Sequence, residues 1–91
     1  MDEMFDFNSE GLEFEWDETD DSINYAKYGV HLKTAVRIFL DQYKLIRPDD
    51  QHPGENRYNV LGKVGNVMLD VDCVVSGDIV RLVAARAASM P

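Results

Sequence analysis

Apolar residues between positions 32 and 40 repeat with the period of a helix. They fall at i, i+3, i+4, i+7 and i+8, the stripe of an amphipathic helix packed against a core; they are Leu32, Ala35, Val36, Phe39 and Leu40. His31 stands just before this segment, where Ser, Thr or Asp would cap a helix better. The pattern therefore predicts a core-facing helix with a weak start.

A second helical segment precedes it at residues 18–28. Asp17 is a suitable N-cap for this segment, and Gly29 suits the left-handed position that commonly ends a helix. The apolar stripe is thin, because only Ile23 and Ala26 are expected to face the core. The sequence thus predicts a helix here from its end signals more than from its amphipathic pattern.

Alternation of apolar and polar residues, the pattern of half-buried strands, marks the remaining segments. Strands are predicted at residues 14–17, 43–47, 57–63, 67–75 and 79–85. In the fourth of these, Val67 and Cys73 share the expected buried face with the other odd-numbered residues, whereas Asp70 and Asp72 take the opposite face. Tight turns at 64–66 and 76–78, and an exposed loop at 48–54, connect the strands.

Helices followed by strands on short turns indicate an α+β fold, with two N-terminal helices packed on one face of an antiparallel sheet. Ninety-one residues suffice for one domain, expected at residues 13–91 after an acidic extension of weak order at residues 1–12. No apolar run approaches the roughly 20 residues of a membrane helix. The single cysteine, Cys73, is expected to be buried and free, which favours a reducing, cytoplasmic location.

Charge is divided unevenly along the chain. Residues 1–22 hold ten acidic and no basic side chains, a charge of −10, whereas the remaining residues carry nine basic and seven acidic side chains, a charge of +2. Blocks of like charge are usually solvated tails. The alternative is an acidic head that competes with a nucleic acid for the basic remainder of the chain.

Motifs for metal binding or phosphate loops do not occur. There is no HExxH or CxxC spacing, and Gly62, Gly65 and Gly77 are isolated at strand ends and turns. We therefore expect no metal and no cofactor. The chemistry that remains is that of basic, acidic and tyrosine side chains on the predicted strands.

These side chains suit metal-free cleavage of RNA. Such cleavage requires activation of a 2′-hydroxyl, positive charge around the phosphorane, and a proton for the leaving oxygen. Arginine binds two phosphate oxygens at once, and glutamate or tyrosine can transfer protons. We predict a catalytic set of Glu55, Arg57, Arg81 and Arg86 and an RNA-binding set of Lys44, Arg47, Tyr58 and Lys63. The alternative is that they are ordinary surface charges, with Glu55 and Arg57 as a simple ion pair.

Strand parity restricts how these residues can meet. Arg57 and Lys63 share one face of their strand, whereas Tyr58 falls on the other. Arg81 and Arg86 have opposite parity. A shared site therefore requires a bulge between these two arginines, or an Arg86 beyond the regular strand; otherwise one of them is structural.

Several short motifs resemble the BrnT family of toxins. They are Phe14-Glu15-Trp16-Asp17, Asn24, Lys27-Tyr28-Gly29-Val30, Ala35 and Phe39, followed by Glu55-Asn56-Arg57-Tyr58, Gly62 and the closing segment 78–86. The resemblance covers roughly residues 13–88. It implies a RelE-like ribonuclease fold and a toxin of a type II toxin-antitoxin system that cleaves RNA and inhibits translation.

The resemblance also implies partners. Toxins of this family pair with a BrnA antitoxin, which carries a DNA-binding ribbon-helix-helix region. We therefore expect a BrnA-like antitoxin, an RNA substrate, and contact with operator DNA only through the antitoxin. We expect no membrane association, and a homodimer is compatible with the sequence.

Two departures from the family pattern keep a second function open. Lys27-Tyr28-Gly29 stands where the family usually has Lys-His-Gly, and the chain stops at Met90-Pro91 where the family usually continues into a basic segment. One interpretation is an active endoribonuclease. The alternative is a non-catalytic binding module that docks an antitoxin and assists transcriptional repression.

Overall fold

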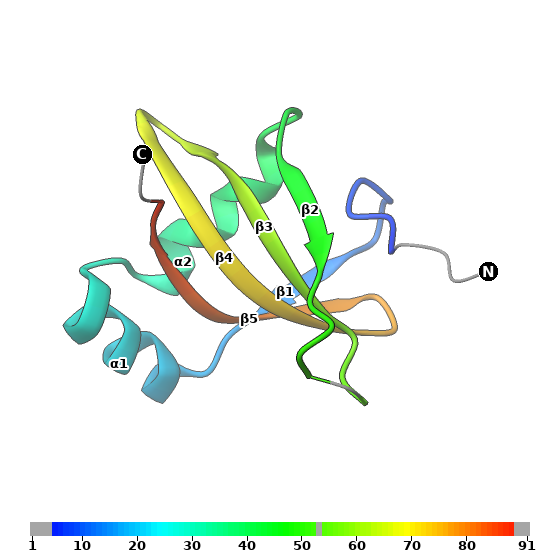
Figure 1. The fold of residues 1–91 in the computed structure, drawn as a ribbon, viewed down its shortest axis with the longest axis horizontal. Helices are drawn as coiled ribbons and strands as arrows, with labels where there is room; N and C mark the ends of the chain where they lie inside the picture. The colour runs from blue at the N-terminus through cyan, green and yellow to red at the C-terminus, as the bar shows by residue number, and fades with distance from the viewer. Residues whose placement is uncertain (1–4, 53, 89–91) are drawn as a thin grey trace.

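Residues 5–52 and 54–88, which the computed structural model describes, form one sheet with helices beside it (Figure 1). The strand order across the sheet is β1-β5-β4-β3-β2. The strands are β1 (Glu13–Glu15), β2 (Leu45–Pro48), β3 (Arg57–Val64), β4 (Val67–Ser76) and β5 (Ile79–Ala87). The helices are α1 (Glu18–Tyr28) and α2 (Leu32–Ala35), and α2 continues as the 3₁₀ helix η1 (Val36–Leu40). The predicted α+β class is confirmed.

The sheet is mixed, which corrects the prediction of an antiparallel sheet. Strands β2 to β5 pair antiparallel with their neighbours, but β1 pairs parallel with β5, with Phe14 opposite Val80. Period-2 alternation shows only that a segment is a strand. The direction of β1 depends on which strand it joins at the other end of the chain, and alternation carries no information about that.

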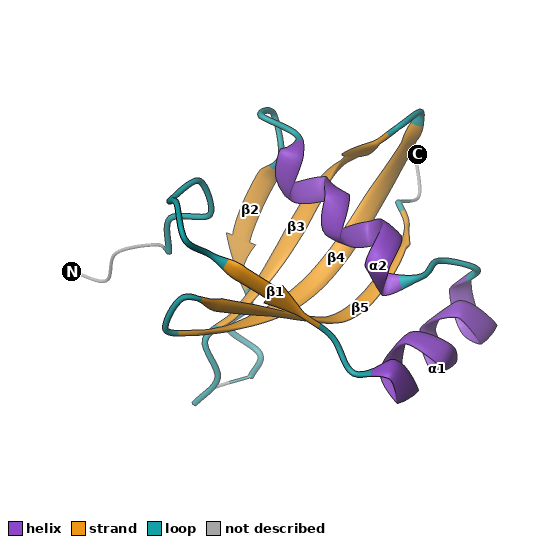
Figure 2. Ribbon diagram, turned by 180° about the vertical axis from the view of Figure 1, so that it is seen from behind, coloured by secondary structure: helices purple, strands orange, loops and turns teal. Residues whose placement is uncertain are grey.

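Helix α2 and η1 cross one face of the sheet, here called the inner face (Figure 2). The helix tightens after Ala35, and a 3₁₀ helix has three residues per turn instead of 3.6. The fully buried residues therefore follow a spacing of three, at Leu32, Ala35 and Ile38. The prediction that Leu40 belongs to the buried stripe is wrong, because the change of period leaves it 84% exposed.

The start of α2 is capped by a residue of the preceding helix. His31 provides no side-chain cap, as expected. Instead, Asp21 Oδ1 accepts the backbone N–H of Leu32 at 2.6 Å, and Asp21 Oδ2 lies 3.0 Å from His31 Nδ1. The bond from Leu32 is the main cause that lowers the pKa of the Asp21 carboxyl. The weak local signal at His31 is thus compensated by a contact that the pattern does not reveal.

The ends of α1 follow the sequence signals. Asp17 Oδ1 accepts the backbone N–H groups of Thr19 and Asp20 at 2.8 and 3.2 Å. Gly29 ends the helix with φ at +71°. Both end predictions are confirmed. No helix within residues 5–52 and 54–88 is long and apolar enough to cross a membrane.

Helix α1 lies beside β5 and attaches through polar residues (Figure 2). Asn24 is 4% exposed; its Nδ2 donates to the carbonyl oxygens of Val30 and Ala85, both at 2.8 Å, and its Oδ1 accepts the Ala85 N–H at 3.0 Å. The predicted apolar stripe is wrong, since Ile23 and Ala26 are exposed. The helix meets the backbone of β5 at this contact, so an amide serves there better than an apolar side chain.

The core lies between the inner face and α2 with η1. Val60, Val71, Cys73, Val80 and Leu82 point into it and are fully buried. The expected burial of Cys73 is confirmed, and burial raises the pKa of its thiol to about 12. The β4 pattern fails only at Val67, which is 50% exposed at the hairpin turn.

Two segments pack closely against the inner face of the sheet, the helix η1 and the N-terminal segment that contains Phe7. A Cβ on Gly62 would lie 2.8 Å from Ile38 Cγ1, so glycine permits η1 to pack against β3. At the other end, Phe7 is 5% exposed and packs against Phe39 and Tyr58, with ring centroids 5.6 and 5.2 Å apart. The segment expected to be an extension of weak order therefore contributes an aromatic residue to the core.

Candidate phosphate-binding face

A β-bulge brings Arg81 and Arg86 to the same face of the sheet. The register passes from Cys73 opposite Leu82 to Asp72 opposite Ala84, so β5 has one extra residue. The extra residue reverses the alternation of side chains along β5, so residues of opposite parity before and after the bulge point to the same face. Leu82 and Ala85 are buried, and both arginines lie on the outer face. The requirement derived from parity is met by the bulge.

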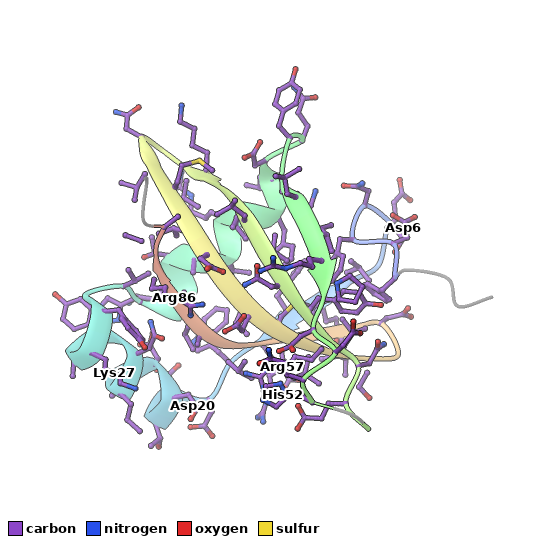
Figure 3. The ribbon with its side chains drawn as sticks, viewed as in Figure 1. Asp6, Asp20, Lys27, His52, Arg57 and Arg86 are labelled. Carbon is purple, nitrogen blue, oxygen red and sulfur yellow. The ribbon has the colours of Figure 1, made fainter. Side chains whose placement is uncertain are left out.

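The outer face contains a hollow of about 540 Å³. Three arginines from three strands line it: Arg47 at the end of β2, Arg57 at the start of β3, and Arg86 in β5. The loop between β2 and β3 adds His52 to the same wall. In Figure 3, His52 and Arg57 lie side by side, and Arg86 lies farther across the face.

Arg86 is held by two carboxylates of β4. Its Nη2 lies 3.2 Å from Asp70 Oδ2, and its Nη1 lies 3.5 Å from Asp72 Oδ2. Asn59 Nδ2 donates to both aspartates, at 3.0 Å to Asp72 Oδ1. Asn59 also accepts from Arg47 Nη2 at 3.5 Å. A polar network therefore joins β2, β3, β4 and β5 beneath the hollow.

Arg57 is held by two other carboxylates. Its Nη1 lies 3.4 Å from Glu55 Oε2, and its Nε lies 3.5 Å from Asp49 Oδ2. The Nε atom is buried and has no hydrogen-bond partner among the described residues. Asp49 Oδ2 also lies 3.0 Å from His52 Nδ1. The backbone N–H of Gln51, and then His52 and Arg57, hold the pKa of the Asp49 carboxyl below its usual value.

The other predicted site residues lie away from the hollow. Arg81 pairs with Glu15 of β1 at 3.3 Å, and Lys63 lies at the far end of β3 in a second depression beside Arg37. Lys44 Nζ donates to Asn8 Oδ1 at 2.9 Å. Tyr58 is 5% exposed on the inner face, where its hydroxyl accepts the backbone N–H of Phe5 at 3.1 Å. Its placement among RNA-contacting residues is therefore corrected, because the ring belongs to the core.

Carboxylates balance the arginines around the hollow. Asp49, Asp50 and Asp72 line it together with the three arginines, and Asp70 lies just beyond them. The sequence interpretation missed these aspartates as partners, although the shared parity of Asp70 and Asp72 indicated their face. It also missed His52, whose position depends on how residues 48–52 fold against β3.

These features define a small α+β domain whose polar sheet face brings three arginines and three aspartates around one hollow. The sequence profile of the family described as "Ribonuclease toxin, BrnT, of type II toxin-antitoxin system" matches residues 16–90 of this chain. The chain belongs to this BrnT family of ribonuclease toxins, which act with an antitoxin partner. A comparison with curated proteins gives no match.

Proposed function

We propose that this protein is a metal-independent endoribonuclease that cleaves RNA, inhibits translation and is neutralised by a BrnA-like ribbon-helix-helix antitoxin. The observation that carries the proposal is the meeting of Arg47, Arg57 and Arg86 around one hollow. Membership of a ribonuclease toxin family supports the same substrate class. The RelE-like arrangement implied by the sequence resemblance is part of this proposal.

In the proposed mechanism, Arg57 and Arg86 bind the scissile phosphate from two sides. Guanidinium groups hold phosphate oxygens in a planar, two-pronged geometry and balance the charge that develops as the 2′ oxygen attacks phosphorus. Arg47 also lines the hollow and suits a neighbouring phosphate. The products are a 2′,3′-cyclic phosphate and a free 5′-hydroxyl.

The test of this function is cleavage of a labelled oligoribonucleotide by purified protein in the presence of a metal chelator. We expect cyclic-phosphate products, and we expect expression without antitoxin to arrest growth and degrade transcripts. Coexpression of the antitoxin should restore growth. Intact RNA after incubation with soluble, folded protein would contradict the proposal.

Ion pairs within the site should restrain RNA binding. Arg86 must exchange Asp70 and Asp72 for phosphate oxygens, and both carboxylates repel a polyanion. Replacing both by asparagine preserves side-chain shape and removes two negative charges. We expect RNA to bind about tenfold more tightly, with a steeper salt dependence, because Arg86 then contributes more fully to binding phosphate. Fluorescence anisotropy of labelled RNA at several salt concentrations measures this.

The matched control for that variant is a double change at Glu10 and Glu13, which also removes two negative charges but lies on or before β1. We expect Glu10→Gln with Glu13→Gln to alter RNA affinity less than the pair at β4. Equal gains in affinity from both variants would contradict this explanation. They would mean that RNA affinity depends on the net charge of the protein and not on the release of Arg86 from its ion pairs.

The same ion pairs favour a second candidate function. A toxin scaffold whose arginines are satisfied internally fits a non-catalytic module that docks an antitoxin and assists repression. Exposed apolar residues suit such docking: Leu40, Tyr43 and Leu45 are 84%, 80% and 67% exposed. Leu40 lines a depression together with the basic side chains of Arg37 and Lys63. The chelator assay separates the two functions, because only the first predicts cleaved RNA.

A further inference from the structure

His52 and Asp49 form a hydrogen-bonded pair in the wall of the hollow. His52 Nδ1 lies 3.0 Å from Asp49 Oδ2, and the imidazole side chain is 45% exposed. The same carboxylate oxygen lies 3.5 Å from Arg57 Nε. One aspartate therefore orients both a histidine and an arginine that line the hollow.

This geometry determines which nitrogen of His52 is available. Asp49 accepts N–H donors from Gln51 and lies beside Arg57, and these contacts keep its carboxylate ionised. An ionised carboxylate only accepts hydrogen bonds, so neutral His52 carries its proton on Nδ1. Nε2, on the opposite side of the ring, is then the basic atom.

We infer that His52 is the general base of the reaction and that Asp49 is its positioning residue. This inference rests on the proposed ribonuclease function. As the 2′ oxygen attacks phosphorus, its proton passes to His52 Nε2. The bond from phosphorus to O5′ breaks, and O5′ takes a proton from water. The hydroxide that remains takes the proton from Nε2, which restores neutral His52 and balances the reaction.

Both negatively and positively charged side chains surround His52. Asp49 and Asp50 belong to its own loop, Arg47 and Arg57 come from β2 and β3, and Asp72 and Arg86 lie across the hollow. Of these groups, Asp49 is the one that bonds directly to the imidazole. Its negative charge stabilises the imidazolium that forms when Nε2 takes the proton.

The experiment is single-turnover cleavage of an oligoribonucleotide across about pH 5 to 8, the range in which histidine titrates. For the unchanged protein we expect the rate to rise with pH and to level off after one ionisation. His52→Gln should lower the plateau by about 10²- to 10⁴-fold and remove that ionisation. Asp49→Asn should lower the plateau less and alter the shape of the pH profile.

The chain offers a matched control in its other histidine. His31 also pairs through Nδ1 with an aspartate at 3.0 Å, but at the junction of α1 and α2. His31→Gln should keep both the plateau and the midpoint. Circular dichroism of each variant confirms that it is folded, and the exposed loop position of His52 makes its replacement compatible with the fold.

A second substrate separates a base from an acid. When sulfur replaces the bridging 5′ oxygen, the leaving group needs no proton. Loss of a general acid then no longer lowers the cleavage rate. We expect the defect of His52→Gln to persist with this substrate, and recovery of the rate would overturn the role as base. A His52→Gln variant with unchanged rate and pH profile overturns the inference alone, whereas no cleavage by the unchanged protein overturns the ribonuclease function itself.

Discussion

Replacing Arg57 and Arg86 together by alanine should lower the rate of RNA cleavage by at least about 10³-fold. Removal of a single preorganised donor to a transition-state charge typically costs about 10²- to 10³-fold, and here two guanidinium groups are lost from the strands on either side of β4. Single-turnover rates with saturating protein measure this effect on chemistry apart from binding. Each single variant should lose less than the pair.

Arg81→Ala is the control that distinguishes the hollow from the remainder of the sheet face. Arg81 shares this face but pairs with the exposed Glu15 at 3.3 Å and does not line the hollow. Surface pairs of this kind contribute about 1 kcal/mol or less to stability. We expect the variant to cleave RNA within a few-fold of the unchanged protein. A loss as large as that of the double variant would place the phosphate nearer to β1.

Stability must be measured alongside these rates. Arg86→Ala leaves Asp70 and Asp72 on one face without their cation, so their mutual repulsion acts on the folded state. Urea unfolding of each variant shows whether the protein remains folded under assay conditions. An inactive variant that unfolds would say nothing about phosphate binding, and in that case Arg86→Gln, which retains a donor of similar length, replaces it.

The strands and the two ends of α1 were readable from local sequence because their causes are local. Alternation in β4 placed Val71 and Cys73 inside and Asp70 and Asp72 outside, and the structure confirms both faces. Asp17 acts through neighbouring N–H groups. Such signals operate within a few residues and need no knowledge of the remaining fold.

The misassigned elements depend on contacts between distant segments. Leu40 is exposed because η1 tightens where it packs over β3 at Gly62. Phe7 is buried because Phe39 and Tyr58 form its surroundings. Neither partner is adjacent in sequence, so periodicity cannot indicate the outcome.

The candidate site was predicted in part for the same reason. Parity placed Arg57 on the face opposite Tyr58, and it showed that Arg81 and Arg86 could share a site only with a bulge between them or with Arg86 beyond the regular strand. The structure has the bulge. Which of the two arginines lines the hollow was not readable, because this depends on how residues 48–52 of the loop help to form the hollow. His52 enters the site only through that loop.

Asn24→Ala should lower the free energy of unfolding by about 3 kcal/mol, because the change removes three hydrogen bonds in which a buried amide takes part. The Ala85 N–H and the two carbonyl oxygens that remain would be left without these partners near the junction of α1 and β5. Urea unfolding followed by Trp16 fluorescence measures the change. Ser22→Ala, an exposed change on the same helix, should leave stability within about 0.5 kcal/mol.

Asn24→Asp separates hydrogen bonding from side-chain size. The carboxylate nearly matches the amide in shape, but it turns a donor into an acceptor facing the carbonyls of Val30 and Ala85. We expect it to destabilise the protein at least as much as alanine does, and a stability near that of the unchanged protein would show that packing dominates. Because Ala85 immediately precedes Arg86 on β5, loosening this contact should also reduce RNA cleavage in the fraction that remains folded. Helix α1 would then contribute to the site by fixing the strand from which Arg86 projects.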